Sequence, residues 1–226
     1  LFCSMCHKAR AAPKDPPASP AAGWTQILSN IFSFNIFPLA TQLRATPPAK
    51  HRLDILNSVF KDASKSPLKS KDLKSFEGLD FFPVDSSYII RASIELTPNT
   101  PFIGMPTSTD DKSYYRKFGM LTFTLKEKEM QLTLYQSLEE SENPIFKDYL
   151  FLPFTDETSG GDSYGGGRYM DVFKSNINTD GTLELNFNNT YNPYCAYNED
   201  YSCPLTPRDN HLNIAILAGV KDFKKY

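Results

Sequence analysis

From residue 88 onward apolar and polar residues alternate, and this period of two constrains the fold more than any other feature of the chain. The segment 88–96, YIIRASIEL, alternates as a strand with one buried face does. Between 121 and 134, apolar residues at every second position flank the polar turn 126–129, which predicts a β-hairpin. Further strand-like runs are 149–154, 168–173, 182–187 and 211–219. Many short strands with turns between them predict a mainly β fold, an antiparallel β-sandwich or a barrel-like domain.

One segment has helical spacing instead. In His51–Lys61 four apolar residues form one stripe, namely Leu53, Leu56, Val59 and Phe60, and a Pro-Pro pair precedes the segment. A chain of 226 residues is long enough for one domain of ordinary size. We therefore expect a single β domain over 50–226 that begins with one short N-terminal helix.

Residues 1–49 have a different composition. They include the Pro- and Ala-rich stretch AAPKDPPASPAA and are expected to form a disordered tail or an export or targeting segment. The apolar run 23–40 fits the core of an export signal, with Lys8, Arg10 and Lys14 as its positive flank, and it fits an unstructured extension equally. Polar residues and Pro38 interrupt this run, so no stable membrane span is expected. The export interpretation predicts a periplasmic or secreted protein.

The charge balance argues against one class of partner. The chain has 24 basic and 26 acidic residues, a formal net charge of -2, and no long basic run. Proteins that track phosphate backbones carry basic patches, so we expect no nucleic-acid partner.

The four cysteines form two close pairs. Cys3, Cys6 and His7 match the C-x-x-C-H pattern of c-type haem attachment, but a Pro- and Ala-rich stretch follows where a haem domain needs helices, so no cofactor is expected. Cys195 and Cys203 are disulfide candidates in an exported protein. A zinc site that adds His211 and a pair of free thiols are the alternatives, and we expect no metal.

A glycine-rich element, Tyr164–Tyr169, separates two strand-like runs. In one interpretation its three glycines, Gly165, Gly166 and Gly167, are required only by the backbone, which must bend or adopt a positive φ. Alternatively, their amide groups line an anion-binding concavity, and Arg168 provides a planar bidentate partner. A nucleotide phosphate loop is excluded, because no Gly-Lys-Ser/Thr follows.

Alternation places Arg168 on the same strand face as two apolar residues, Met170 and Val172. A charge on an apolar face is costly unless it is paired, so we expect Arg168 to be at least partly buried and to pair with Asp156 or Asp162. We also expect it to face the loop Asn192–Cys195. Loop carboxylates can act as acid and base, although most are simply solvated.

The stretches GLDFFPVD, YLFLPFTDETSGGDSYGGGRYMDV and LNFNNTYNPYCAYNEDYSCPLTPRDNHLNIAILAGVK together resemble the domain-of-unknown-function 1684 family, known chiefly from bacteria. The resemblance covers about residues 50–222. It identifies the domain without naming a reaction, and it favours export, since members often carry an export signal. The second motif is matched by Phe187, Asn188, Tyr191, Asn192, Pro193, Cys195, Cys203 and Pro204, with Asn186 where an Asp is expected.

These observations lead first to a non-enzymatic domain that binds a small polar or anionic ligand. The alternatives are a hydrolase-like enzyme that uses loop carboxylates with Arg168, and a structural domain without a ligand. The ligand-binding candidates are Tyr164, Gly165, Gly166, Gly167, Arg168, Tyr169, Asn188, Tyr191, Asn192, Asp156 and Asp162.

Overall fold

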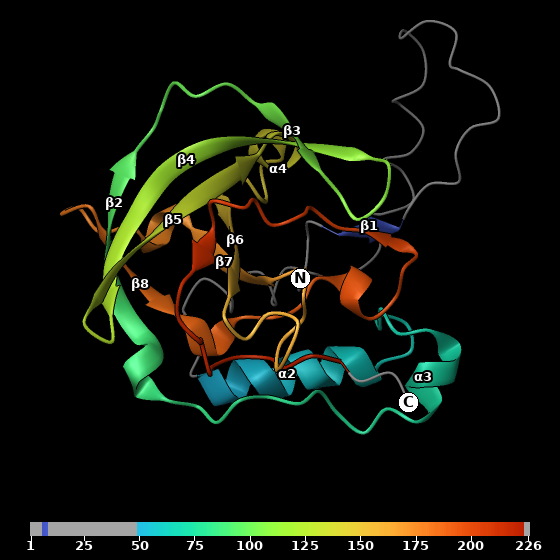
Figure 1. Cartoon of the computed structure of the whole chain (residues 1–226). Helices are drawn as coiled ribbons and strands as arrows, with labels where there is room; N and C mark the ends of the chain where they lie inside the picture. Colours follow the sequence, from blue (N-terminus) through green and yellow to red (C-terminus); the bar gives the residue numbers. More distant parts are fainter. Residues whose placement is uncertain (1–5, 9–48, 224–226) are drawn as a thin grey trace, which may run out of the picture.

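The structure is a computed structural model that describes residues 6–8 and 49–223. Element labels follow Figure 1. The strands are β1 His7–Lys8, β2 Ile89–Leu96, β3 Ile103–Pro106, β4 Lys112–Leu125, β5 Lys128–Ser137, β6 Tyr149–Asp156, β7 Arg168–Phe173, β8 Thr182–Asn186, β9 Tyr201–Ser202 and β10 His211–Leu212. The helices are α2 Ala49–Lys61, α3 Ser70–Lys74 and α4 Leu138–Glu142, with short 3-10 turns η1 Ser86–Tyr88, η2 Lys174–Asn176, η3 Phe187–Asn189 and η4 Tyr194–Ala196.

Most strands join one curled sheet, which forms a half-barrel in Figure 1. Its order is β10-β6-β5-β4-β2-β8, with β3 added to β4 and β7 added to β6. These neighbours are antiparallel except β10 and β6, which run parallel. The predicted mainly β, barrel-like class is therefore confirmed.

The hairpin predicted between 121 and 134 is confirmed, and its turn is tighter than predicted. Leu125 pairs with Lys128, so only Lys126 and Glu127 form the turn. Their φ angles are 49° and 65°, as a two-residue turn that follows the right-handed strand twist requires.

Alternation along the strands divides the buried residues between two clusters. Leu150 and Leu152 of β6 enter a leucine-rich core, which also contains Leu121, Leu132 and Leu183. Tyr149 and Phe151 of the same strand enter a tyrosine-rich core on the other face. The tyrosine-rich core is defined by Tyr115, Tyr135, Tyr149, Tyr169, Tyr191 and Tyr197 with their apolar neighbours.

The N-terminal helix is confirmed as α2, and it covers the tyrosine-rich core. Leu56 and Phe60 on its predicted stripe are buried. The ring of Phe60 packs edge-on against Tyr197 at a centroid distance of 4.7 Å. The five-residue helices α3 and α4 were not predicted, because segments this short cannot show a helical period.

The C-terminal run 211–219 forms a strand only at β10, although it was predicted as strand throughout. Ile214, Ile216 and Ala218 are buried at alternating positions, which explains the strand-like pattern. Two of the carbonyl groups in this run, those of Ile216 and Ala218, accept hydrogen bonds from an arginine side chain rather than from a neighbouring strand.

The N-terminal segment contacts the domain at Cys6–Lys8, because β1 pairs antiparallel with β9. The expected tail over 1–49 therefore includes three residues that pack on the folded body. The other parts of that expectation, including the apolar run 23–40, lie outside the described residues. None of the helices in the described ranges is long and apolar enough to cross a membrane.

Candidate functional site

A buried ion pair lies at the centre of the glycine-rich motif. It joins Arg168, the first residue of β7, to Asp156, the last residue of β6, with 2.7 Å between Nη2 and Oδ2 and both side chains 0% exposed. The other carboxylate oxygen accepts the backbone N–H groups of Thr158 at 2.8 Å and Ile216 at 3.2 Å. Burial lowers the pKa of Arg168, and the Asp156 carboxylate opposes this shift. Because an arginine remains protonated, a charge pair lies inside the core.

The remaining contacts of Arg168 are also internal. Its guanidinium donates to the carbonyl oxygens of Ala218 at 2.5 Å and Ile216 at 2.9 Å, and it lies 5.4 Å from the ring centroid of Phe154. Arg168 is thus buried and paired with Asp156, but it faces the segment 216–220 rather than the expected loop Asn192–Cys195. Neither side chain of the pair has surface open to a ligand, which corrects the placement of both in an open pocket.

Gly167 is required by the backbone immediately before this arginine. Its φ is 90°, and a Cβ atom there would lie 2.5 Å from the carbonyl oxygen of Phe154. The structural interpretation of the glycines therefore holds at Gly167. At Gly166 the close neighbour is the ring of Tyr164, whose Cε1 would lie 2.5 Å from an added Cβ.

The asparagines of the second motif connect loops. Asn188 exchanges hydrogen bonds with the backbone of Asp85, at 3.0 Å through Oδ1 and 2.8 Å through Nδ2. Asn192 donates to the carbonyl oxygen of Lys221 at 2.9 Å. Both are about 1% exposed, so their present contacts are structural. Asn186 also accepts from the Asn188 backbone at 3.1 Å, an acceptor role that an Asp could fill equally.

The two motifs meet at Tyr169 and Tyr191. These residues exchange backbone hydrogen bonds of 2.8 and 3.0 Å, and the Tyr169 hydroxyl donates to the carbonyl oxygen of Pro204. Their side chains belong to the tyrosine-rich core and are buried. The two motifs therefore converge, and this convergence buries most of the residues expected to bind a ligand.

A second polar cluster surrounds Asp171, which lies on the opposite face of β7 from Arg168. The sequence patterns did not predict this cluster. Arg52 of α2 approaches one carboxylate oxygen to 2.6 Å, and the hydroxyls of Tyr149 and Tyr191 donate to the other at 2.8 and 2.5 Å. Burial, more than the nearby carboxylate, raises the pKa of both tyrosines well above the ordinary value. Alternation alone placed Asp171 on this face, but nothing in the sequence indicated Arg52 as its partner.

One part of both motifs remains accessible, and we call Tyr164, Gly165, Gly166 and Cys195 the motif rim. The two glycines are exposed, and the other two residues are partly buried. A turn closed by the Gly167 N–H and the Tyr164 carbonyl oxygen at 3.0 Å presents the glycines. The Tyr164 hydroxyl lies 3.9 Å from Cys195 Sγ. Asp162, another expected site residue, is exposed in the preceding loop, and its carbonyl oxygen accepts the Asp222 N–H at 2.9 Å.

The disulfide differs from the expected one. Cys203 is bonded to Cys6, with a Cα separation of 4.5 Å, and Cys195 is a free thiol. The predicted pair Cys195–Cys203 is therefore wrong in this structure, because the sulfur of Cys203 is already bonded across 197 positions of sequence. The same bond excludes Cys203 as a zinc thiolate and Cys6 as a haem thioether here. Within 6–8 and 49–223, no three His, Cys, Asp or Glu residues gather as a metal site.

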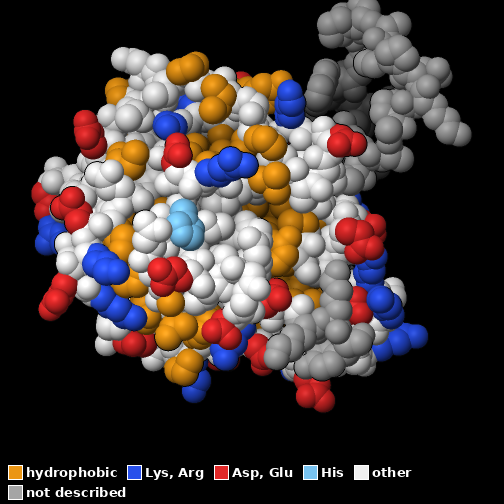
Figure 2. All heavy atoms as spheres, viewed as in Figure 1, with side chains coloured by type: hydrophobic (Ala, Val, Ile, Leu, Met, Phe, Trp, Pro, Cys, Tyr) orange, Lys and Arg blue, Asp and Glu red, His pale blue; other side chains and the backbone are white. Residues whose placement is uncertain are grey.

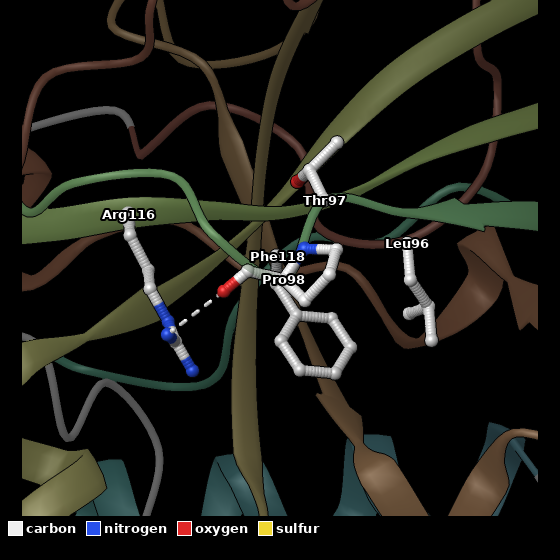
Figure 3. A pocket seen from close by; sticks show the side chains of 5 residues that line it. All are labelled: Leu96, Thr97, Pro98, Arg116 and Phe118. Carbon is white, nitrogen blue, oxygen red and sulfur yellow. Dashed lines mark hydrogen bonds between the residues drawn. The ribbon is translucent and has the colours of Figure 1, made fainter.

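The surface offers a small pocket away from the motifs. Figure 3 shows it lined by Leu96, Thr97, Pro98, Arg116 and Phe118. Its volume is about 110 Å³. Ligand pockets are usually about 300 to 1,000 Å³, so this one suits water molecules better than a metabolite. On the face drawn in Figure 2, acidic and basic side chains are interspersed, without one sign prevailing.

Comparison with known proteins places this geometry in a family. A comparison with curated proteins found no match. Among solved structures, the chain is similar to an uncharacterized protein of Haloarcula marismortui determined by solution NMR, with 31% identity, a TM-score of 0.60 and coverage of 81% of this chain and 94% of that one. The model of the family described as "Protein of unknown function (DUF1684)" matches residues 74–221. Because that match spans more than half of the sequence, the chain belongs to the DUF1684 family.

Proposed function

We propose that the protein is a non-enzymatic domain that binds a small polar ligand at the motif rim. The observation that carries this proposal is the exposure of two backbone donors at the place where the motifs converge. The N–H groups of Gly165 and Gly166 form no hydrogen bond to any described residue, and both glycines face solvent. A carbonyl or hydroxyl oxygen of a ligand can accept from them.

The side chains around these donors indicate the chemistry of the ligand. The Tyr164 ring lies against Gly166 and supplies an apolar face beside the donors. Asp162 is exposed nearby. Burial raises the pKa of Tyr164, and the negative charge of Asp222 adds a smaller contribution in the same direction. These carboxylates repel anions. The rim therefore favours a neutral or cationic, flat ligand with an acceptor oxygen over the anionic ligand considered from sequence.

The enzymatic alternative has less support. A hydrolase-like site built on Asp156 and Arg168 needs those groups to reach a substrate, whereas both side chains are 0% exposed and bind each other and backbone groups inside the core. In the structural alternative the rim binds nothing, and the experiment below distinguishes it from binding.

The experiment uses one position and two substitutions. Gly165→Pro removes the N–H donor. Gly165 is the second residue of the turn 164–167, and neither it nor Gly166 has a positive φ, so proline fits this position. Gly165→Ala keeps the donor, and its Cβ would have only an ordinary contact of 3.5 Å with the Cα of Gly160. Nicotinamide and uracil, at millimolar concentration, are the probes, and amide NMR shifts are the readout.

We expect at least one probe to shift the Gly165 and Gly166 amides of the wild type, and to shift the same Gly166 amide in Gly165→Ala. In Gly165→Pro the Gly166 response should weaken at least fivefold, while the fold is retained. Wild-type amides at the rim that do not respond to either probe, or a Gly166 response that Gly165→Pro leaves unchanged, would contradict the proposal in favour of the structural alternative.

We also propose that the protein functions in an oxidising compartment after export. The Cys6–Cys203 disulfide supports this, because such bonds persist mainly outside the reducing cytosol. Blocking thiols in intact cells before lysis tests it. Cys203 should be recovered in a disulfide, and recovery of Cys203 as a blocked thiol would contradict the proposal.

A further inference from the structure

Three cysteines lie close together beside β9, and two of them are bonded to each other. Cys6 and Cys203 form the disulfide, which fastens β1 to the segment that follows β9. Cys195, in η4, is a free thiol whose backbone N–H donates to the sulfur of Cys203 at 3.3 Å. The N–Cα bond adds about 1.5 Å, so the Cys195 Cα lies within about 4.8 Å of that sulfur. The Cys195 side chain can therefore reach the disulfide.

We propose that Cys6, Cys195 and Cys203 form an intramolecular thiol–disulfide exchange site, in which Cys195 displaces Cys6 from Cys203 and releases β1 from β9. The thiolate of Cys195 attacks Cys203 Sγ, the Cys195–Cys203 bond forms, and the Cys6–Cys203 bond breaks. Cys6 leaves as a thiolate and takes up the proton that Cys195 lost. One disulfide is exchanged for another, so the step needs no oxidant or reductant.

The surroundings of Cys195 determine when this exchange occurs. Burial raises the pKa of its thiol, and the side chains of Ser108 and Tyr164 partly oppose that shift by hydrogen bonding. Burial, and to a smaller degree the Cys195 thiolate, raises the pKa of Tyr164 and Tyr169, so both tyrosines stay neutral at moderate pH. Because the thiolate is the nucleophile, the exchange is slow near neutral pH and accelerates as pH rises.

The exchange has a definite structural consequence. β1 is held to β9 by the pairs His7 with Ser202 and Lys8 with Tyr201, in addition to the disulfide. A strand of two residues has little pairing of its own, so loss of the covalent bond detaches it. The new disulfide closes the short loop between η4 and β9. The protein then alternates between a form with a tethered N-terminal segment and a form with a closed rim loop. This inference does not depend on the proposed ligand.

The test uses the full chain with Cys3→Ser, so that Cys6, Cys195 and Cys203 are its three remaining cysteines. The oxidised protein is incubated without redox reagents at about pH 7 and about pH 9, quenched in acid, alkylated and digested without reduction, and its disulfides are mapped by mass spectrometry. We expect a Cys195–Cys203 peptide to appear with alkylated Cys6, at a rate that rises about tenfold per pH unit below the thiol pKa. Amide exchange of His7 and Lys8 should accelerate in parallel.

Cys195→Ser is the matched control, because serine is close to cysteine in size and shape and lacks the thiol nucleophile. Its Cys6–Cys203 bond should persist at both pH values, and His7 and Lys8 should stay protected. In a chain with Cys3 and Cys6 both replaced by serine, a glutathione redox buffer should form Cys195–Cys203. Persistence of Cys6–Cys203 with free Cys195 at about pH 9 in the three-cysteine protein would overturn the proposal, whatever the other variants do.

Discussion

Strand β7 contributes one residue to each of two arginine–aspartate pairs, and the pairs lie on opposite faces of the sheet. Arg168 and Asp156 are 0% exposed and belong to neighbouring strands. Arg52 and Asp171 are 8% and 7% exposed, and they join helix α2 to the sheet. The distances are similar, at 2.7 and 2.6 Å. The pairs therefore differ in their surroundings rather than in their own geometry.

The surroundings assign different roles to the two pairs. Arg168 donates hydrogen bonds to backbone carbonyl groups of the segment 216–218. These bonds satisfy carbonyl groups that a neighbouring strand would otherwise bind. Asp171 is fixed by tyrosine hydroxyls and by Arg52 of helix α2. Loss of the first pair leaves a charge buried in the core. Loss of the second can be relieved by local opening of α2.

The largest effect is expected from Arg168→Met, which removes the charge and the carbonyl contacts together. It leaves the Asp156 carboxylate buried without its cation, and such losses cost about 3 to 5 kcal/mol. Urea unfolding measures the change, with Arg91→Met, an exposed arginine paired with Asp180, as the control. A loss as small as that of the control would show that the buried pair does not hold the segment.

A smaller effect is expected from Asp171→Asn. The amide keeps an acceptor for the tyrosines but loses the charge that pairs with Arg52, so we expect a loss of about 1 to 3 kcal/mol. Hydrogen exchange in α2 should accelerate more than exchange in β4 and β5. Asp54→Asn, on an exposed position of the same helix, should change neither. Uniform acceleration over all strands would contradict a local role in docking α2.

The smallest effect concerns Glu140, a half-buried carboxylate of α4. Burial, with a smaller contribution from Glu139, raises its pKa from 4.5 to about 7. The folded state therefore binds more protons than the unfolded state between about pH 4.5 and 7, and stability falls as pH rises through that window. Solvent screening keeps the effect below about 1 kcal/mol. Glu140→Gln should remove this decline, and Glu129→Gln, at an exposed position, should retain it.

Much of the fold could be predicted because it depends on local alternation. The period of two located β2, the β4–β5 hairpin, β6, β7 and β8, and it placed Arg168 on the leucine-rich face. The same argument required a partner for the arginine, and Asp156 is that partner. A periodic pattern cannot distinguish a strand from an extended segment whose carbonyls bind a side chain, which is why 213–219 was misassigned.

The site was less predictable because it depends on distant contacts. Cys6 and Cys203 are separated by 197 positions, and the nearer cysteine, Cys195, gave the plausible but wrong pair. Arg52 and Asp171 are likewise 119 positions apart. The motif residues do converge, yet the sequence could not indicate that this would bury Arg168, Asn188 and Asn192 rather than expose them.

The central claim is that the motifs are built around a buried ion pair whose two side chains depend on each other. A double-mutant cycle of Arg168→Met and Asp156→Leu tests it most directly. Each single variant leaves one buried charge, whereas the double variant leaves two apolar side chains. We expect the double variant to be more stable than the sum of the single losses predicts, by about 2 to 3 kcal/mol. Strictly additive losses would contradict the claim, because they would show that the two side chains stabilise the fold independently.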